Sequence, residues 1–195
     1  MAAAPRLKMT YAEYLAAEES AREKHDFLAG EVFAMSGGTL EHSALSSTVG
    51  AILRASLKDK SCIVFESNAR VRRVESDFSC YPDVTVVCGG VKRAADDSEG
   101  IANPVLLVEV LSESTESYDR GEKSRQYRLM PSAREIVLIS QGRRSVEVHR
   151  RNAEGRFEIY EWTQGTAELR SVGVMVGLDA LYADVEALRA RSATP

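Results

Sequence analysis

The chain has 195 residues, a formal net charge of −4, and a composition of 44% hydrophobic and 28% charged residues. This composition excludes a disordered chain, and the length is typical of one domain with a single hydrophobic core. The negative net charge argues against a protein that coats nucleic acid non-specifically, because such proteins rely on clustered Lys and Arg. Any contact with nucleic acid would therefore be local.

Targeting signals and cysteine usage bear on the compartment. The first residues lack the apolar core of a signal peptide, and no stretch approaches the roughly 18 apolar residues of a membrane span. We therefore expect a cytoplasmic protein without a membrane segment, with a flexible N-terminus at 1–9 and one domain at 10–192. Cys62, Cys80 and Cys88 have no C-x-x-C spacing. We interpret them as reduced core thiols rather than a disulfide framework or a zinc ribbon.

The first predicted elements are a helix, a hairpin and a longer helix. Thr10 and Glu13 form a capping-box pattern, which predicts a helix from about Tyr11 to Ala21. Apolar residues at 27–28 and 32–35 flank a glycine-containing turn, which predicts an antiparallel hairpin. Between residues 39 and 58 apolar side chains recur at helical spacing, so this helix should lie on a sheet.

The rest of the chain alternates between strands and helices. Short β-branched or aromatic runs predict strands at 62–65, 69–74 and 81–88, and the charged residues 91–100 predict an exposed loop. The run 105–111 is the most apolar strand, so burial on both faces is expected. The later predictions are a helix at 119–130, a strand at 135–139, an antiparallel hairpin within 146–160 and a closing helix at about 180–191.

Two carboxylates stand out within these strands. Glu109 interrupts the apolar run 105–111, and a buried ionised carboxylate is normally paired, protonated or bound to a metal. Asp83 follows Pro82 at the mouth of another predicted strand. Two carboxylates that converge in one cleft repel each other unless a cation neutralises them. The alternative for a lone strand glutamate is a satisfied buried ion pair or a strand end in solvent.

Carboxylate oxygens of this kind suit Mg²⁺ or Mn²⁺, which keep several waters and also bind a substrate phosphate. Such an ion supports hydrolysis of a phosphodiester by in-line attack. The chemistry also needs a cation that holds the attacking water or the phosphate, and Lys123 is the best candidate. It lies on the helix after the Glu109 strand, with Tyr127 on the same helix face. The alternative is a solvated surface lysine.

Three segments carry a resemblance to a known family: 81–87 with Pro-Asp83, 108–114 with Glu109, and 119–127 with Lys123 and Tyr127. They strongly resemble the Uma2 family of restriction-endonuclease-like proteins, also called domain of unknown function 820. The resemblance extends from Tyr11 to Tyr182 and includes residues 30–31 and 35–42. That family is similar to the PD-(D/E)-x-K nuclease superfamily, which implies an α/β fold with a mixed central sheet flanked by helices and with antiparallel hairpins.

The resemblance also implies roles for individual residues. Asp83 corresponds to the first metal-binding acid and Glu109 to the second. The superfamily motif places a lysine two residues after the second acid, where this sequence has Leu111. The family pattern implies that Lys123 on the following helix takes over this function.

Two further residues are weaker candidates. Glu31 would be an additional acid, since many superfamily members add a carboxylate from the N-terminal region, and His42 stands where the family commonly has histidine. The alternative for Glu31 is a surface residue beside a turn, and for His42 a helix-capping or pairing role.

The predicted function is therefore that of a Mg²⁺- or Mn²⁺-dependent endonuclease that hydrolyses phosphodiester bonds of DNA. One alternative is a catalytically inactive nuclease-fold module with a binding or regulatory role, which Leu111 and the acidic net charge favour. Another is an oligomeric structural protein that pairs through the edge of the tail hairpin. A homodimer is compatible with catalysis too, because many nucleases cut two strands as symmetric dimers.

Overall fold

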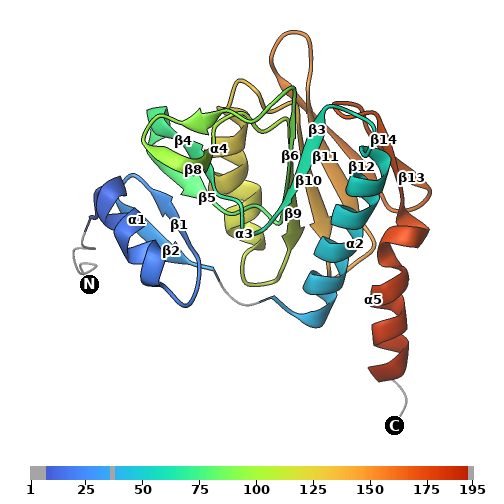
Figure 1. Ribbon diagram of the computed structural model, residues 1–195. Helices are drawn as coiled ribbons and strands as arrows, with labels where there is room; N and C mark the ends of the chain where they lie inside the picture. Colours follow the sequence, from blue (N-terminus) through green and yellow to red (C-terminus); the bar gives the residue numbers. More distant parts are fainter. Residues whose placement is uncertain (1–7, 36–37, 193–195) are drawn as a thin grey trace.

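Two six-stranded sheets form the centre of the structure, a computed structural model that describes residues 8–35 and 38–192 (Figure 1). The first sheet has the order β2 (Glu31–Ala34), β1 (His25–Leu28), β5 (Phe78–Cys80), β4 (Val71–Arg73), β8 (Asp97–Ile101) and β7 (Arg93–Ala94). The second sheet has the order β12 (Phe157–Trp162), β11 (Val146–Arg151), β10 (Glu135–Ser140), β9 (Leu106–Leu111), β6 (Val84–Cys88) and β3 (Cys62–Glu66). Both sheets are mixed, because β4 and β8 pair in parallel in one, and β9 and β10 in the other.

The remaining elements surround these sheets. The helices are α1 (Tyr11–Ser20), α2 (Leu40–Ser56), α3 (Glu116–Tyr118), α4 (Ser124–Arg128) and α5 (Leu178–Ser192), with a 3₁₀ turn at Val74–Ser76 and a π-helical segment at Asp119–Lys123. A separate hairpin joins β13 (Thr166–Leu169) to β14 (Val174–Gly177). The predicted capping box is confirmed, since the Thr10 hydroxyl accepts from the Glu13 amide and the Glu13 carboxylate accepts from the Thr10 amide.

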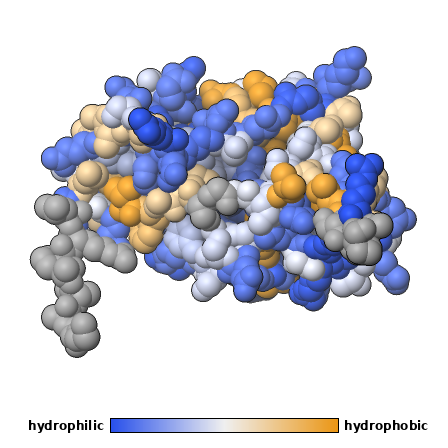
Figure 2. All heavy atoms as spheres, turned by 90° about the horizontal axis from the view of Figure 1, so that it is seen from below, coloured by the Kyte–Doolittle hydropathy of each residue, from blue (hydrophilic) through white to orange (hydrophobic). Residues whose placement is uncertain are grey.

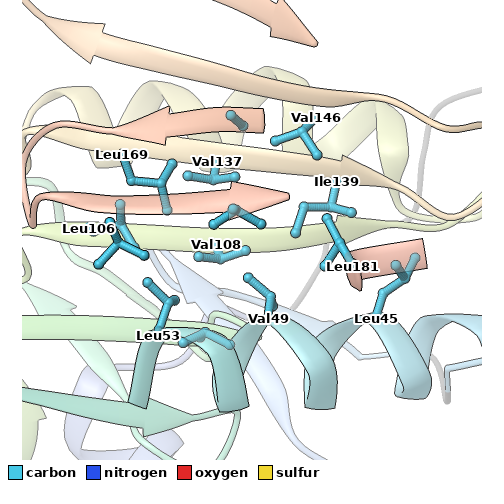
Figure 3. Close-up of a cluster of buried hydrophobic side chains, with 14 of the residues drawn as sticks. Leu45, Val49, Leu53, Leu106, Val108, Val137, Ile139, Val146, Leu169 and Leu181 are labelled. Atoms are coloured by element: carbon cyan, nitrogen blue, oxygen red, sulfur yellow. The ribbon is translucent and has the colours of Figure 1, made fainter. Parts of the chain in front are cut away.

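The larger core lies between α2 and the second sheet (Figure 3). Leu45, Val49 and Leu53 recur every four residues along α2, so they share one helix face, and all three are buried. They lie in one cluster with Leu106 and Val108 of β9. The predicted contact between this helix and a sheet is thereby confirmed.

The opposite face of the second sheet meets the first sheet and α4. Leu107 and Leu111 alternate with the residues facing α2, because successive side chains on a strand point to opposite faces. They pack with Phe78 and Cys80 of β5 and with Tyr127 of α4. All six residues of β9 are buried, as predicted for this strand. A carboxylate at position 109 therefore enters an apolar layer.

Several predictions were wrong in the middle of the chain. The expected strand 81–88 begins only at Val84, and the preceding β5 belongs to the other sheet. The expected loop 91–100 contains β7 and β8. Asp97 in β8 is buried and accepts hydrogen bonds from Arg70 and Tyr11. The charged residues of this segment predicted a loop, because the residues that pair with Asp97 lie far away in the sequence. The hairpin β13–β14 was also not predicted.

The cysteine prediction was wrong for two of the three residues. Cys62 and Cys88 form a disulfide, whereas Cys80 is a buried free thiol as expected. The two bonded cysteines are direct cross-strand partners in β3 and β6, and opposed residues in an antiparallel pair have closely spaced Cβ atoms. Their sequence spacing gave no sign of this register.

The outer surface is mixed in character. Seen from below, hydrophobic side chains form separated patches among hydrophilic ones (Figure 2). Within the described part of the chain, no helix combines the length and the apolar character needed to span a membrane. Of the predicted flexible N-terminus at 1–9, residues 1–7 lie outside the described residues, as do Ser36 and Gly37 of the family-like segment 35–42.

Candidate active site

The two predicted acids line one pocket at neighbouring strands of the second sheet. Glu109 lies on β9, and Asp83 immediately precedes β6, whose first residue Val84 is opposite Val108 of β9. Asp83 Oδ2 also accepts a hydrogen bond of 2.7 Å from the Val110 amide. This bond fixes the carboxylate at the point where β6 begins.

Glu109 is buried among apolar residues, with 3% of its surface exposed. It lies on the same face of β9 as Leu107 and Leu111, whose side chains belong to the layer between the sheets. Burial raises the pKa of Glu109 well above its usual value, the positive charge of Lys123 opposes this rise, and Asp119 adds to it. The carboxylate therefore depends on its neighbours to hold a negative charge.

Lys123 reaches this carboxylate from the helical segment that follows β9. Its Nζ lies 3.1 Å from Glu109 Oε2 and 3.6 Å from both Asp26 Oδ2 and Asp119 Oδ1. Burial alone lowers the pKa of a lysine, but here Asp26, Glu109 and Asp119 outweigh it and raise the pKa of Lys123 well above the usual value. The ammonium therefore stays charged.

The backbone at Lys123 departs from regular α-helix. Residues Asp119–Lys123 form a π-helical segment, and the Ser124 hydroxyl donates a hydrogen bond of 2.6 Å to the Asp119 carbonyl at its end. Such insertions change the direction in which the following side chains point, and they are frequent at functional sites. Here the segment leads directly into α4, which places Lys123 over Glu109.

Tyr127 holds the other oxygen of the same carboxylate. Its hydroxyl donates a short hydrogen bond to Glu109 Oε1 and lies 3.3 Å from Cys80 Sγ. Burial raises the pKa of Tyr127 well above its usual value, so the phenol remains a donor. Tyr127 follows Lys123 by one helical turn, and the predicted sharing of one helix face brings both side chains to Glu109.

His42 lies beside the other acid. Thr39 caps α2 by accepting from the His42 amide, which places the imidazole in the first turn of that helix. His42 Nε2 is 3.3 Å from Asp83 Oδ2, and this contact raises the pKa of His42 against the opposing effect of burial. The histidine therefore pairs with a neighbour, which was one of the alternatives that the sequence left open.

Two acids near Lys123 were not predicted from the sequence. Asp26 on β1 is 3% exposed, its Oδ1 accepts from the Tyr81 amide at 3.2 Å, and burial raises its pKa. Asp119 lies four residues before Lys123. The signal for Asp26 was the one used for Glu109, a carboxylate inside a strand, but the predicted strand began at residue 27.

Glu31, the predicted additional acid, does not line the pocket formed by these residues. It begins β2 opposite Leu28 of β1, on the turn of the hairpin. Leu111 occupies the position of the superfamily lysine and is 2% exposed within the apolar layer. The lysine near the second acid therefore comes from the helix, as the family pattern implied.

Asp83, Glu109, Lys123 and their neighbours line a pocket of about 100 Å³. That volume exceeds the roughly 15 Å³ needed by a water molecule, so it has room for a small hydrated ion. Four carboxyl groups line it (Asp26, Asp83, Glu109 and Asp119), together with the basic side chains of Lys123 and His42. A cation bound beside these carboxyl groups would favour their ionised forms.

The donor set fits a hard divalent cation. Among the described residues, no three His, Cys, Asp or Glu side chains are arranged as a ready metal cage. Mg²⁺ and Mn²⁺ do not require one, because they bind through one or two carboxylates and retain several waters. Both Glu109 oxygens already accept protein hydrogen bonds, from Lys123 and Tyr127. A carboxylate still has further lone pairs for a metal ion.

The comparisons with known proteins cover almost the whole chain. A family model with the description "Uma2: Putative restriction endonuclease" matches residues 11–184. The uncharacterized protein slr1290 of Synechocystis sp. is 33% identical over 180 residues, which is 92% of this chain and 94% of that protein. A second uncharacterized Synechocystis protein, sll1609, is 32% identical over 161 residues, or 83% and 91% of the two chains.

A solved structure shares the fold. The crystal structure of "a putative nuclease belonging to DUF820" from Anabaena variabilis superposes with a TM-score of 0.73, covering 91% of this chain and 99% of the other. The sequences are 17% identical, so this likeness concerns the fold alone. It confirms the predicted mixed α/β architecture with helices around mixed sheets.

Proposed function

This chain belongs to the Uma2 family, and from that premise we propose that it is a Mg²⁺- or Mn²⁺-dependent endonuclease that hydrolyses phosphodiester bonds of DNA. One observation carries the proposal. Asp83 and Glu109 line the same pocket, and Lys123 Nζ lies 3.1 Å from Glu109 Oε2. Two carboxylates beside a fixed cation are the groups that a metal-assisted attack on a phosphate requires.

The acidic and basic residues of the pocket would have different roles. Asp83 and Glu109 would hold the ion through carboxylate oxygens, and the ion when bound would supply positive charge to the phosphate. Lys123 keeps its ammonium in the pocket and is placed to hold the attacking water or a phosphate oxygen. Tyr127 and the Val110 amide fix the two carboxylates, so these have little freedom to turn away.

Cleavage assays test this function. We would incubate supercoiled, linear and single-stranded DNA with Mn²⁺, Mg²⁺ or EDTA, using wild type beside Asp83→Ala, Glu109→Ala and Lys123→Ala. Lys92→Ala and Glu154→Ala are matched controls, because both residues are exposed and neither lines the pocket. We expect cleavage that needs metal, is lost in the three site variants and is retained in the controls.

Other outcomes favour the alternatives. A folded wild type that cleaves no substrate and whose melting temperature does not rise with Mg²⁺ or Mn²⁺ would contradict the proposal, because a bound ion stabilises the folded state. The buried Leu111 at the superfamily lysine position would then support an inactive binding or regulatory module. Molar mass measured in solution tests the expected homodimer independently of cleavage.

A further inference from the structure

A second hollow opens from the active pocket. Met35, Gly38, His42 and Asp83 line both, so the two spaces adjoin at these residues. The second hollow has a volume of about 610 Å³, which is within the range of ligand sites. We call it the serine groove, and its walls include Arg22, Lys24, Ser43, Ser46, Ser47 and Ser67.

One wall of the serine groove is the polar face of α2. Ser46 and Ser47 follow Ser43 by three and four residues, so each is a neighbour of Ser43 on the helix surface. Leu45 and Val49 point from the same turns into the core, which leaves the serine face outward. The helix therefore presents a group of hydroxyls that begins at Ser43, the residue after His42.

The opposite wall carries charged side chains of both signs, the basic Arg22 and Lys24 and the acidic Glu23 and Glu66. Lys24, between α1 and β1, donates a hydrogen bond of 2.8 Å to the Ser67 carbonyl and another to Asn68 Oδ1. Burial lowers the pKa of Lys24, and the negative charge of Asp83 opposes this effect. Glu66 also lines the groove, but Arg54 forms an ion pair with it at 2.9 Å. Lys24 and Arg22 are therefore the groups of this wall that attract an anion, beside the acidic Glu23.

The Ser46 hydroxyl is a buried polar group of the groove wall. Its Oγ is shielded from solvent and has no hydrogen-bond partner among the residues that the structure describes. An unsatisfied hydroxyl of this kind destabilises the folded chain. Ser46 also lines the groove, where a ligand oxygen could accept this hydrogen bond.

We propose that the serine groove holds the sugar–phosphate backbone of the DNA strand next to the scissile phosphate, with Lys24 and Ser46 contacting one phosphate group. This inference rests on the proposed function, since the groove leads directly to Asp83. Lysine, arginine and serine side chains are among the groups that contact DNA phosphates, and such contacts set the position of the strand without reading its sequence. The occupant is thus defined by its backbone and not by its bases.

Binding measured without cleavage tests the groove. Fluorescence anisotropy of a labelled DNA duplex in EDTA at several salt concentrations gives both the affinity and its salt dependence. Lys24→Ala should reduce the slope of log affinity against log salt by about 0.9, because one phosphate contact is lost, and Lys24→Arg should retain it. Ser46→Ala should weaken binding roughly tenfold, as expected for a lost hydrogen bond to a charged group.

Two matched controls separate binding from folding. Lys92→Ala removes an exposed lysine, and Ser56→Ala removes an exposed serine at the end of the same helix; neither residue lines the groove. Both should bind DNA as wild type does. Ser46→Ala should not lower the unfolding midpoint, since the hydroxyl has no partner among the described residues. A purely structural role would instead lower that midpoint and leave affinity unchanged.

The outcomes distinguish a failure of the groove proposal from a failure of the nuclease proposal. If wild type binds and cleaves DNA while Lys24→Ala keeps the full salt slope and Ser46→Ala the full affinity, the groove proposal is overturned and the nuclease proposal stands. If wild type neither binds nor cleaves DNA, both are overturned. Binding that depends on Lys24 and Ser46 in a protein without cleavage would support the groove and contradict only the catalytic proposal.

Discussion

Lys123 Nζ lies 3.1 Å from Glu109 Oε2 across 14 residues of chain, and both side chains are 4% exposed. Neither group faces bulk water, so each depends on the other for its charge. Asp26 and Asp119 lie 3.6 Å from the same ammonium. A single lysine therefore compensates three carboxylates at the centre of the candidate site.

The first prediction concerns this pair. Lys123→Met should lower the free energy of unfolding by about 3–5 kcal/mol, because it leaves a buried carboxylate without its cation. Glu109→Gln alone should also destabilise the protein, and the double variant should recover part of the loss. Urea unfolding of all four proteins gives the coupling energy, with Lys92→Met as a surface control. Strictly additive effects would show that the two groups do not interact.

Local patterns made much of this site predictable. The apolar run 105–111 had to be a buried strand, which marked Glu109 as a residue in need of a partner. Helical spacing placed Lys123 and Tyr127 on one face, and both contact Glu109. These inferences succeeded because each depends on residues close together in the sequence. The catalytic roles of these residues stay predictions.

Contacts between residues far apart in the sequence could not be predicted in this way. Asp97 is buried because Arg70 and Tyr11 satisfy it, and nothing within 91–100 indicates those partners. Cys62 and Cys88 meet because the register of β3 and β6 opposes them. Both cases need the arrangement of strands in the sheets, which alternation and composition do not specify.

The second prediction concerns the stability of the folded protein at acidic pH. Asp97 is buried, which alone raises its pKa, but bonds from Arg70 and Tyr11 outweigh burial and lower the pKa to about 2. A lowered pKa in the folded state stabilises the protein above the unfolded pKa of about 3.9, and this stabilisation is lost as the pH falls toward 2.

Asp97→Asn should therefore cost on the order of 2 kcal/mol at pH 7, and the difference from wild type should shrink as the pH falls from 4 to 2. Urea unfolding at each pH measures it. Asp59→Asn, an exposed aspartate, controls for the change of charge. A difference that stays constant over this range would contradict the assigned pKa direction.

The third prediction concerns the bond between Cys62 and Cys88, which closes a loop with a sequence separation of 26. Reduction should lower the free energy of unfolding by about 3–4 kcal/mol through the greater freedom of the unfolded chain. Unfolding with and without a dithiol reductant measures the effect. The Cys62→Ser/Cys88→Ser variant should match reduced wild type and ignore the reductant, and a thiol count of three in the untreated protein would show that the bond does not form.

The last prediction concerns the transfer of the lysine from position 123 to position 111. Leu111 and Glu109 are on the same face of β9, so a lysine at 111 would approach the carboxylate from the strand. Leu111→Lys alone should destabilise the protein by several kcal/mol, because it adds a second buried cation beside Lys123 and removes an apolar side chain from the layer between the sheets. Combined with Lys123→Leu, the same change should cost less than the sum of the two single variants, since one cation again meets Glu109. Urea unfolding reports the coupling, and DNA cleavage by the double variant reports whether the cation serves from either position. If the two substitutions are additive, a lysine at 111 does not reach Glu109, and the position on the helix is then the one that this fold can use.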